Sequence, residues 1–251
     1  TIAIMGRVLD QDDGLGVYSL NLLREMFRLD RSTHYDVLLQ TPKYQDAFRE
    51  FPNAQTHVLP AATKLLWDQW VVPRAARRLN AQLIFNPKFS IPLLSSIPCV
   101  FVLQGSDWYV NPANYPWWDN LYIRLMLPLY CRKATGLLSI SQATIEDLVK
   151  YASLDVRGAF VTYAGVAPNF TTTRDSAALE RFRREYRLPE RYIFTVARTF
   201  HIGHTKVPPY PGGNTERLMR GYQGYRKQGG KLPFVVAGYR VEDYLRSRGF
   251  T

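Results

Sequence analysis

A loop rich in glycine and aspartate, Gln11-Asp-Asp-Gly-Leu-Gly-Val17, follows the first apolar run of the sequence and precedes a helical pattern. Gly14 and Gly16 allow the backbone to approach a ligand closely, and a helix that begins here presents free N–H groups to an anion. The loop lacks the third glycine of a dinucleotide fingerprint, and the carboxylates of Asp12 and Asp13 would repel a tightly held pyrophosphate. It is therefore either a ligand loop or a tight structural turn.

Two histidines lie in the sequence His201-Ile-Gly-His204, which is the tetrapeptide that binds ATP phosphates in class I aminoacyl-tRNA synthetases. Three prolines follow at once, between positions 208 and 211, so the segment cannot open a helix as that motif requires. The histidine spacing also suits part of a zinc site, but no cysteine or third histidine lies near it. We assign neither ATP nor a metal to this segment.

Aromatic residues are concentrated in the segment 107–124, which holds three of the five tryptophans and lies near Arg124, Arg132 and Lys133. These rings either pack under a neighbouring helix, dock on a lipid surface, or stack on a sugar. A nucleic-acid partner is not expected, because no recognised binding module accompanies the aromatic residues.

These residues must be positioned by an α/β fold, because short β-branched or apolar runs alternate with longer helical patterns along the chain. This order is typical of a parallel sheet with helices on both faces. We expect strands at 2–5, 35–39, 56–59, 83–86, 99–103, 136–140 and 160–162. We expect helices at 16–29, 64–79, 118–133 and 142–151, the last of them capped by Ser141.

The periodic pattern lapses between residues 164 and 176, which predicts two domains, 1–170 and 171–251. The second segment predicts helices at 177–186, 215–227 and 241–248 and strands at 192–197 and 234–237. Two strands are too few for an independently buried parallel sheet. We expect either a truncated domain or one completed by another chain or by the first domain.

The net charge of +11 requires an anionic partner such as nucleic acid, anionic lipid or a phosphorylated small molecule. The longest apolar stretch, 121–130, is broken by Arg124 and Pro128 and is shorter than the roughly 20 residues that a spanning helix needs. Only two cysteines are present, which is typical of a reducing compartment. We infer a cytoplasmic protein, with a peripheral position at the inner membrane face as an option.

Four motifs occur in order at residues 14–24, 102–107, 125–148 and 163–166. Taken together, they resemble the acceptor-side domain of retaining GT-B glycosyltransferases of family 4. This resemblance covers most of residues 1–170. Three further segments, 192–198, 214–222 and 234–238, resemble more weakly the start of that family's nucleotide-sugar domain.

The resemblance implies metal-independent transfer of a sugar from a nucleotide-sugar to a glycan or lipid-linked acceptor, with retention at the anomeric carbon and no cofactor. Arg198 matches the basic position that neutralises the leaving diphosphate, and Lys206 is the candidate for its partner. Gly14 and Gly16 match the loop over the diphosphate and donor sugar. Gly165 matches the crossover between the two domains.

Two departures from the family pattern bear on activity. Gln104 occupies the position of the family's histidine, and with Asp107 it is expected to contact sugar hydroxyls, although glutamine cannot act as an acid or base near neutral pH. The family's pair of glutamates eight positions apart is absent from the 251 residues. We therefore expect a fragment, a degenerate relative of the family, or one part of a composite enzyme that is completed as a homo-oligomer or by a separate C-terminal half. The rival hypothesis is a non-catalytic or truncated partner that binds a glycan or another transferase. A basic adaptor at a membrane surface is a third reading.

Overall fold

The computed structural model describes residues 1–11, 13–167, 170–171, 175–197, 215–238, 241–247 and 249. The chain divides into two compact units, Thr1–Ala167 and Pro168–Thr251, and each is described by itself.

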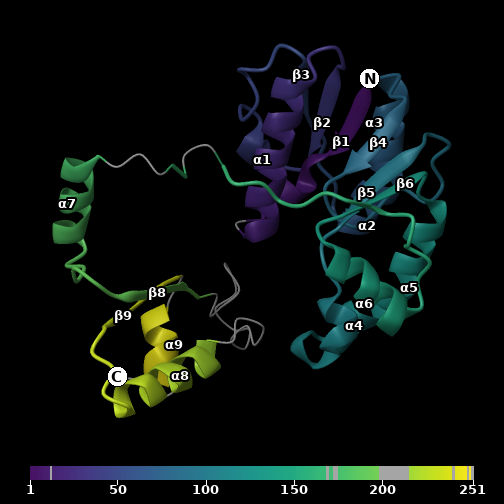
Figure 1. Cartoon of the computed structure of the whole chain (residues 1–251). Helices are drawn as coiled ribbons and strands as arrows, with labels where there is room; N and C mark the ends of the chain where they lie inside the picture. The colour runs from purple at the N-terminus through teal and green to yellow at the C-terminus, as the bar shows by residue number, and fades with distance from the viewer. Residues whose placement is uncertain are drawn as a thin grey trace. The chain divides into compact units, whose positions relative to one another are not determined.

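The first unit is built on a parallel sheet of seven strands in the order β3-β2-β1-β4-β5-β6-β7 (Figure 1). The α/β prediction is confirmed, and the expected strands lie within two residues of the observed ones. The strands are β1 (Ile2–Met5), β2 (Tyr35–Leu39), β3 (Ala54–Val58), β4 (Leu83–Asn86), β5 (Cys99–Leu103), β6 (Gly136–Ser139) and β7 (Phe160–Val161).

Helices cover both faces of this sheet, as the alternation of side chains along β1 requires. Ile4 packs on one face with Leu23 and Phe27 of helix α1 (Gly14–Leu29). Ala3 packs on the other face against the remaining helices. These are a π-helical turn η3 (Trp67–Val71), α3 (Val72–Arg78), α5 (Trp117–Lys133) and α6 (Gln142–Ala152). The short helix α2 (Lys64–Leu66) precedes η3 directly and buries none of its residues.

Shorter elements connect these layers. The 3₁₀ turn η1 (Gly6–Asp10) follows β1 directly, η2 (Pro42–Tyr44) follows β2, and α4 (Asp107–Val110) with η4 (Pro112–Asn114) precedes α5. The cap expected for α6 is confirmed, because the Ser141 hydroxyl accepts a hydrogen bond from the Thr144 amide at 3.2 Å.

In the second unit, strands β8 (Ile193–Val196) and β9 (Phe234–Ala237) pair in parallel. Three helices accompany them: α7 (Ser176–Glu185), α8 (Thr215–Lys227) and α9 (Val241–Ser247). Helix α7 buries none of its side chains, so its arginines form a solvated basic face.

Candidate functional site

The strand order reverses between β1 and β4, because the chain passes from β1 to β2 on one side and from β4 to β5 on the other. In open α/β sheets, ligands bind outside the carboxyl ends of the strands at such a switch point. Arg7 lies two residues after the end of β1, and Lys88 lies two residues after the end of β4. The sheet therefore places two cations at the position where a ligand is expected.

The glycine loop lies beside this switch point and is closed by its own aspartate. The Asp13 carboxylate accepts hydrogen bonds from the amides of Leu15 at 2.9 Å and Gly16 at 3.2 Å. Helix α1 thus begins at Gly14, two residues before the predicted start, and Asp13 caps it. Two of the first-turn amides that were expected to face an anion already have a partner.

The two glycines of the loop differ in what surrounds them. A Cβ atom on Gly16 would lie 1.9 Å from the backbone oxygen of Gln11, so this glycine is required by the packing of the loop on itself. A Cβ atom on Gly14 would meet nothing within 4 Å, and Gly14 is exposed. Gly14 is therefore the glycine with open space for a ligand.

The loop after β4 is shaped by the buried Asn86. Its Nδ2 donates to the backbone oxygen of Ser90 at 2.7 Å and its Oδ1 accepts from the Lys88 amide at 2.9 Å. The Lys88 ammonium in turn donates to Oε1 of Gln11 at 3.1 Å. Asn86 thereby fixes the backbone that carries Lys88 toward the glycine loop.

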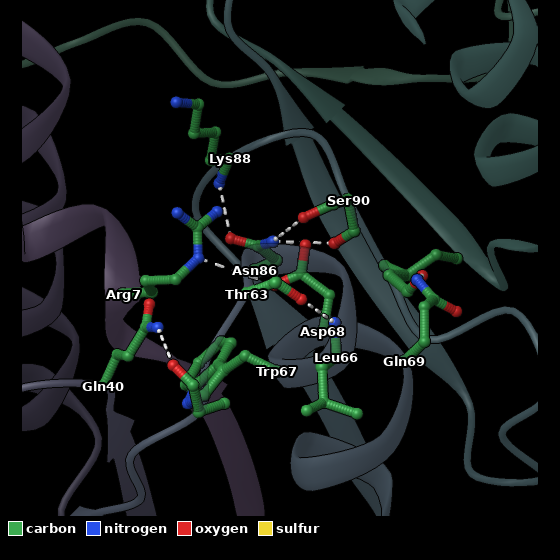
Figure 2. Close-up of polar contacts among 12 residues, drawn as sticks. Arg7, Gln40, Thr63, Leu66, Trp67, Asp68, Gln69, Asn86, Lys88 and Ser90 are labelled. Atoms are coloured by element: carbon green, nitrogen blue, oxygen red, sulfur yellow. Dashed lines mark hydrogen bonds and ion pairs between the residues drawn. The ribbon is translucent and has the colours of Figure 1, made fainter.

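Asp68 supplies a buried negative charge below these cations. It is 1% exposed, it lies in the π-helical turn η3, and one of its carboxylate oxygens is 3.6 Å from Nε of Arg7. Figure 2 shows Arg7 and Lys88 on the same side of Asp68, with Asn86 and Ser90 beside them. Burial raises the pKa of Asp68 against the opposing effects of Arg7 and Lys64.

Lys64, the first residue of α2, adds a third cation. Its Nζ lies 4.9 Å from the ring centroid of Tyr122 and 5.9 Å from that of Phe89. Burial lowers the pKa of Lys64, and the charge of Arg7 lowers it further. Burial, followed by the charges of Lys64 and Arg7, lowers the pKa of Lys88 to about 8. The three cations are thus close enough to repel one another in a partly desolvated setting.

Gln104 follows β5 at the same edge of the sheet. Its Nε2 donates to the backbone oxygen of Pro87 at 2.5 Å, which links it to the loop that carries Lys88. The next residue, Gly105, has a φ of +152° that favours glycine and turns the chain into α4. Gln104 thus lies next to the loop of Lys88, a neighbour that the sequence did not predict for it.

Asp107 begins α4 and holds the aromatic segment together. Its Oδ2 accepts from the Tyr115 hydroxyl at 2.8 Å and its Oδ1 accepts from the Asn111 amide at 2.6 Å. Trp108 packs edge-on against Phe89 at 4.9 Å between ring centroids. This part of the segment therefore packs within the first unit, which agrees with the interpretation that its aromatic rings pack within the fold.

The remaining predicted residues are not brought to this edge. Gly165 is exposed near the end of the first unit, and a Cβ atom on it would meet nothing within 4 Å. Arg198, Lys206, His201 and His204 lie outside the described residues. Within the described ranges, no three His, Cys, Asp or Glu side chains gather into a group that could hold a metal ion.

Sequence reasoning missed the cluster of Arg7, Lys64, Asp68 and Lys88. A signal was present for two of its members, because Arg7 and Lys88 closely follow runs that the sequence predicts as strands. The carboxyl ends of parallel strands meet at one edge of a sheet.

Comparisons with known proteins assign the fold of the chain to a structural class. No protein-family model and no curated protein matches the chain. Its fold is similar to that of HepE from Anabaena in complex with UDP and glucose, with a TM-score of 0.52 and 13% identity over 96% of this chain and 70% of HepE. It is also similar to a glycosyltransferase from Rickettsia africae, with a TM-score of 0.62 and 9% identity over 98% of this chain and 62% of that protein. The chain has a GT-B-like fold.

A further similarity is to MnaA of S. aureus in a co-structure with UDP, with a TM-score of 0.50 and 10% identity over 98% of this chain and 64% of MnaA. The chain therefore spans between 62% and 70% of the length of these three GT-B-like proteins. At identities this low the likeness concerns the fold, Rossmann-like in both units.

Proposed function

We propose that this chain takes part in glycosyl transfer from a nucleotide-sugar, as a retaining, metal-independent transferase of the family 4 type. Residues 1–170 form the acceptor-side domain and residues 171–251 form part of the nucleotide-sugar domain. The observation that supports this most is the GT-B-like fold, which the chain shares with proteins whose structures hold UDP or UDP-glucose.

The proposed chemistry rests on neutralising the charge that develops as the nucleoside diphosphate leaves. Arg198 and Lys206 are assigned to the diphosphate, since paired cations suit phosphate oxygens. Gly14 leaves open space for the donor beside α1, whereas Gly16 keeps the loop compact enough to present it. No metal and no cofactor takes part in this scheme.

Gln104 and Asp107 are assigned to the hydroxyls of the sugar. Oε1 of Gln104 would accept a hydrogen bond from a hydroxyl of the donor sugar, while Nε2 donates to the backbone oxygen of Pro87. Each Asp107 oxygen has further lone pairs beyond the bonds to Asn111 and Tyr115. Both residues would orient the sugar, and neither supplies a proton.

The test is mass-spectrometric detection of sugar transfer or donor hydrolysis with UDP-, GDP- and ADP-sugars. We expect turnover that persists in excess EDTA and is lost in Arg198→Ala. The coupling constant of the anomeric proton in the product should match that of the donor. An inverted product would contradict retention, and loss of turnover in EDTA would contradict metal independence. Turnover that survives Arg198→Ala would remove the assigned phosphate site.

The rival function is a non-catalytic partner that binds a glycan or another transferase. It is favoured by the absence of the glutamate pair and by Gln104 in place of histidine. Calorimetric titration with UDP separates the two readings, because the rival predicts no nucleotide binding. Turnover that appears only with a second copy, or with a separately supplied C-terminal half, would identify a composite enzyme.

A second candidate function, docking on an anionic lipid surface, is favoured by the outer side of α5. Trp117 and Trp118 are 69% and 58% exposed, and three further apolar side chains follow at helical spacing. These are Leu121, Leu125 and Leu129. No described helix is long and apolar enough to cross a membrane. Rings and leucines beside cations instead suit the interface of a bilayer.

Three basic side chains of α5 complete this lipid-facing surface: Arg124, Arg132 and Lys133, all exposed. Vesicles that contain phosphatidylserine should therefore bind the protein, and binding should fall as salt rises. Trp117→Ala with Leu121→Ala should weaken vesicle binding by about tenfold or more, since each buried side chain contributes about 1.5–3 kcal/mol. Arg198→Ala is the matched control and should bind vesicles normally. Equal binding to vesicles of pure phosphatidylcholine would contradict the charge component.

A further inference from the structure

Three cations from segments far apart in the sequence meet at the carboxyl edge of the first sheet. Arg7 comes from η1, Lys64 from α2 and Lys88 from the loop after β4. The positive charge of Arg7 lowers the pKa of both lysines, and the charge of Lys64 also lowers the pKa of Lys88. Gathering like charges in a partly buried place costs free energy, which a bound anion would offset.

The described carboxylates near the three cations attract them without forming an ion pair with either lysine. Asp68 lies 3.6 Å from Arg7, and Asp13 caps α1 through one oxygen. Asp68 and Asp119 act on Lys64, each less strongly than Arg7 does. Among the described residues, no carboxylate forms an ion pair with Lys64 or Lys88. The repulsion from neighbouring cations exceeds the attraction from Asp13 and Asp68 at Lys88, as the order of influences on its pKa indicates.

Aromatic rings hold the two ammonium groups in place without neutralising them. Lys64 lies over Tyr122 and Phe89, and Lys88 lies 5.5 Å from the centroid of Phe89. A ring face attracts a cation but does not take its protons. The ammonium groups therefore keep N–H donors for another partner, with one donor of Lys88 used by Gln11.

We propose that Arg7, Lys64 and Lys88 form a binding site for an oxyanion, a phosphate or carboxylate, carried by the sugar acceptor. The proposal rests on the proposed function, in which Arg198 and Lys206 take the diphosphate of the donor. With those two cations assigned, the three cations of the first unit are available to the acceptor. The acceptor class is then a sugar phosphate or a uronic acid rather than a neutral glycan.

This acceptor site lies next to the residues assigned to the donor sugar. Gln104 is joined through Pro87 to the loop that carries Lys88, and Gln11 joins that loop to the glycine loop. The anion of the acceptor would therefore bind beside the donor sugar. Figure 2 shows the Arg7 guanidinium beside the backbone of Lys88, whose side chain extends away from it on the same side of Asp68. A planar donor and a point charge can contact different oxygens of one oxyanion.

The test is calorimetric titration of the full chain with inorganic phosphate, glucose 6-phosphate, glucuronate and glucose, each with and without saturating UDP. Glucose 6-phosphate or glucuronate should bind at least about tenfold more tightly than glucose, and should still bind when UDP is present. Lys88→Met and Lys64→Met should each weaken this binding about tenfold, because each removes a charge-assisted hydrogen bond to the anion. Lys133→Met on α5 is the matched control and should change nothing.

Each other outcome decides against a named part of the scheme. Displacement of the sugar phosphate by UDP would place the donor diphosphate on the cluster and overturn the acceptor assignment. Equal binding of glucose and its charged analogues, or unchanged binding in both lysine variants, would overturn the oxyanion site. Failure of the proposed function looks different, because UDP would then not bind while the charged sugars still would.

A folding control keeps the lysine variants interpretable. Circular dichroism and tryptophan emission should match those of the unaltered chain, because methionine retains most of the lysine stem and its contacts with the rings. Should either single variant fail to fold, Lys64→Gln or Lys88→Gln replaces it in the same titration, with the same expected loss.

Discussion

Lys88 Nζ donates a hydrogen bond to Oε1 of Gln11 at 3.1 Å, between residues 77 positions apart in the sequence. The bond joins the loop after β4 to the loop before α1, where the strand order reverses. The same Gln11 presents the backbone oxygen that leaves no room for a side chain at Gly16. The glycine loop and the cationic loop are therefore one structural unit, and a change in either should be felt by the other.

The lowered pKa of Lys88 predicts a specific dependence of stability on pH. Below pH 8 Lys88 is charged in both the folded and the unfolded chain, and its burial destabilises the folded one. Between about pH 8 and pH 10.5 the folded protein has released the proton that the unfolded chain still holds, so stability rises with pH. A shift of this size corresponds to roughly 3 kcal/mol at most.

Lys88→Met should remove this rise. At pH 7 the free energy of unfolding in urea should be higher for the variant by up to about 2 kcal/mol, a figure that allows for the lost hydrogen bond to Gln11. This difference should become smaller by pH 10. Tryptophan emission is a suitable probe, because all five tryptophans lie in the first unit. The exposed Lys133→Met is the control. Parallel pH curves for Lys88→Met and the unaltered chain would contradict the prediction.

Gly16 and Gly14 should respond in different ways to alanine. Gly16→Ala places a Cβ at 1.9 Å from the Gln11 oxygen and should destabilise the first unit by roughly 2–4 kcal/mol. Gly14→Ala meets nothing and should leave stability within about 1 kcal/mol, since alanine is the better helix former. Urea unfolding of both variants checks this. A loss of stability in Gly16→Ala as small as that in Gly14→Ala would mean that the loop can rearrange around residue 16.

Most of the sheet and its helices could be predicted from the sequence because each element carries its own periodicity. The strands of the first unit are short, apolar and flanked by helical patterns, which locates them to within two residues. Helix α1 starts earlier than predicted because its cap is Asp13, whose charge alone suggests only repulsion of a phosphate. The single helix expected over 64–79 contains the turn η3, which periodicity does not reveal.

The candidate site is harder to predict because it depends on contacts between distant segments. Gln104 is found through a resemblance to a family motif, and the structure places it against Pro87 beside Lys88. Lys64 cannot be found in this way, since its proximity to Arg7 and Lys88 arises only in the folded chain. Burial of Asp68 in η3 is likewise a property of the fold.

Asp107 and Tyr115 should be energetically coupled. Asparagine at position 107 can accept through only one atom, so Asp107→Asn loses either the Tyr115 or the Asn111 donor and should cost about 1–2 kcal/mol. Tyr115→Phe removes one of the same bonds. The double variant should therefore be less destabilised than the sum of the two, by about 0.5–1 kcal/mol. Strict additivity in urea unfolding would show that this bond does not hold the aromatic segment.

Both cysteines should react slowly with thiol reagents in the folded protein. Burial raises the pKa of the Cys99 thiol to about 11 and that of Cys131 to about 12, although Lys133 acts weakly in the opposite direction on Cys99. Cys99 is buried, and its thiol donates to the backbone oxygen of Ile97 at 3.3 Å. The thiolate is the reactive form of cysteine. At these pKa values the thiolate fraction of each cysteine at pH 8 is at least about a hundredfold below that of an ordinary cysteine.

Reaction with Ellman's reagent at pH 8 measures this directly. The two thiols of the native chain should react at least about a hundredfold more slowly than those of the chain unfolded in guanidinium chloride. Cys99→Ala and Cys131→Ala report the two sites separately, and Cys131 should remain slow although it is only partly buried. Rapid reaction of Cys131 in Cys99→Ala would contradict the raised pKa of this thiol.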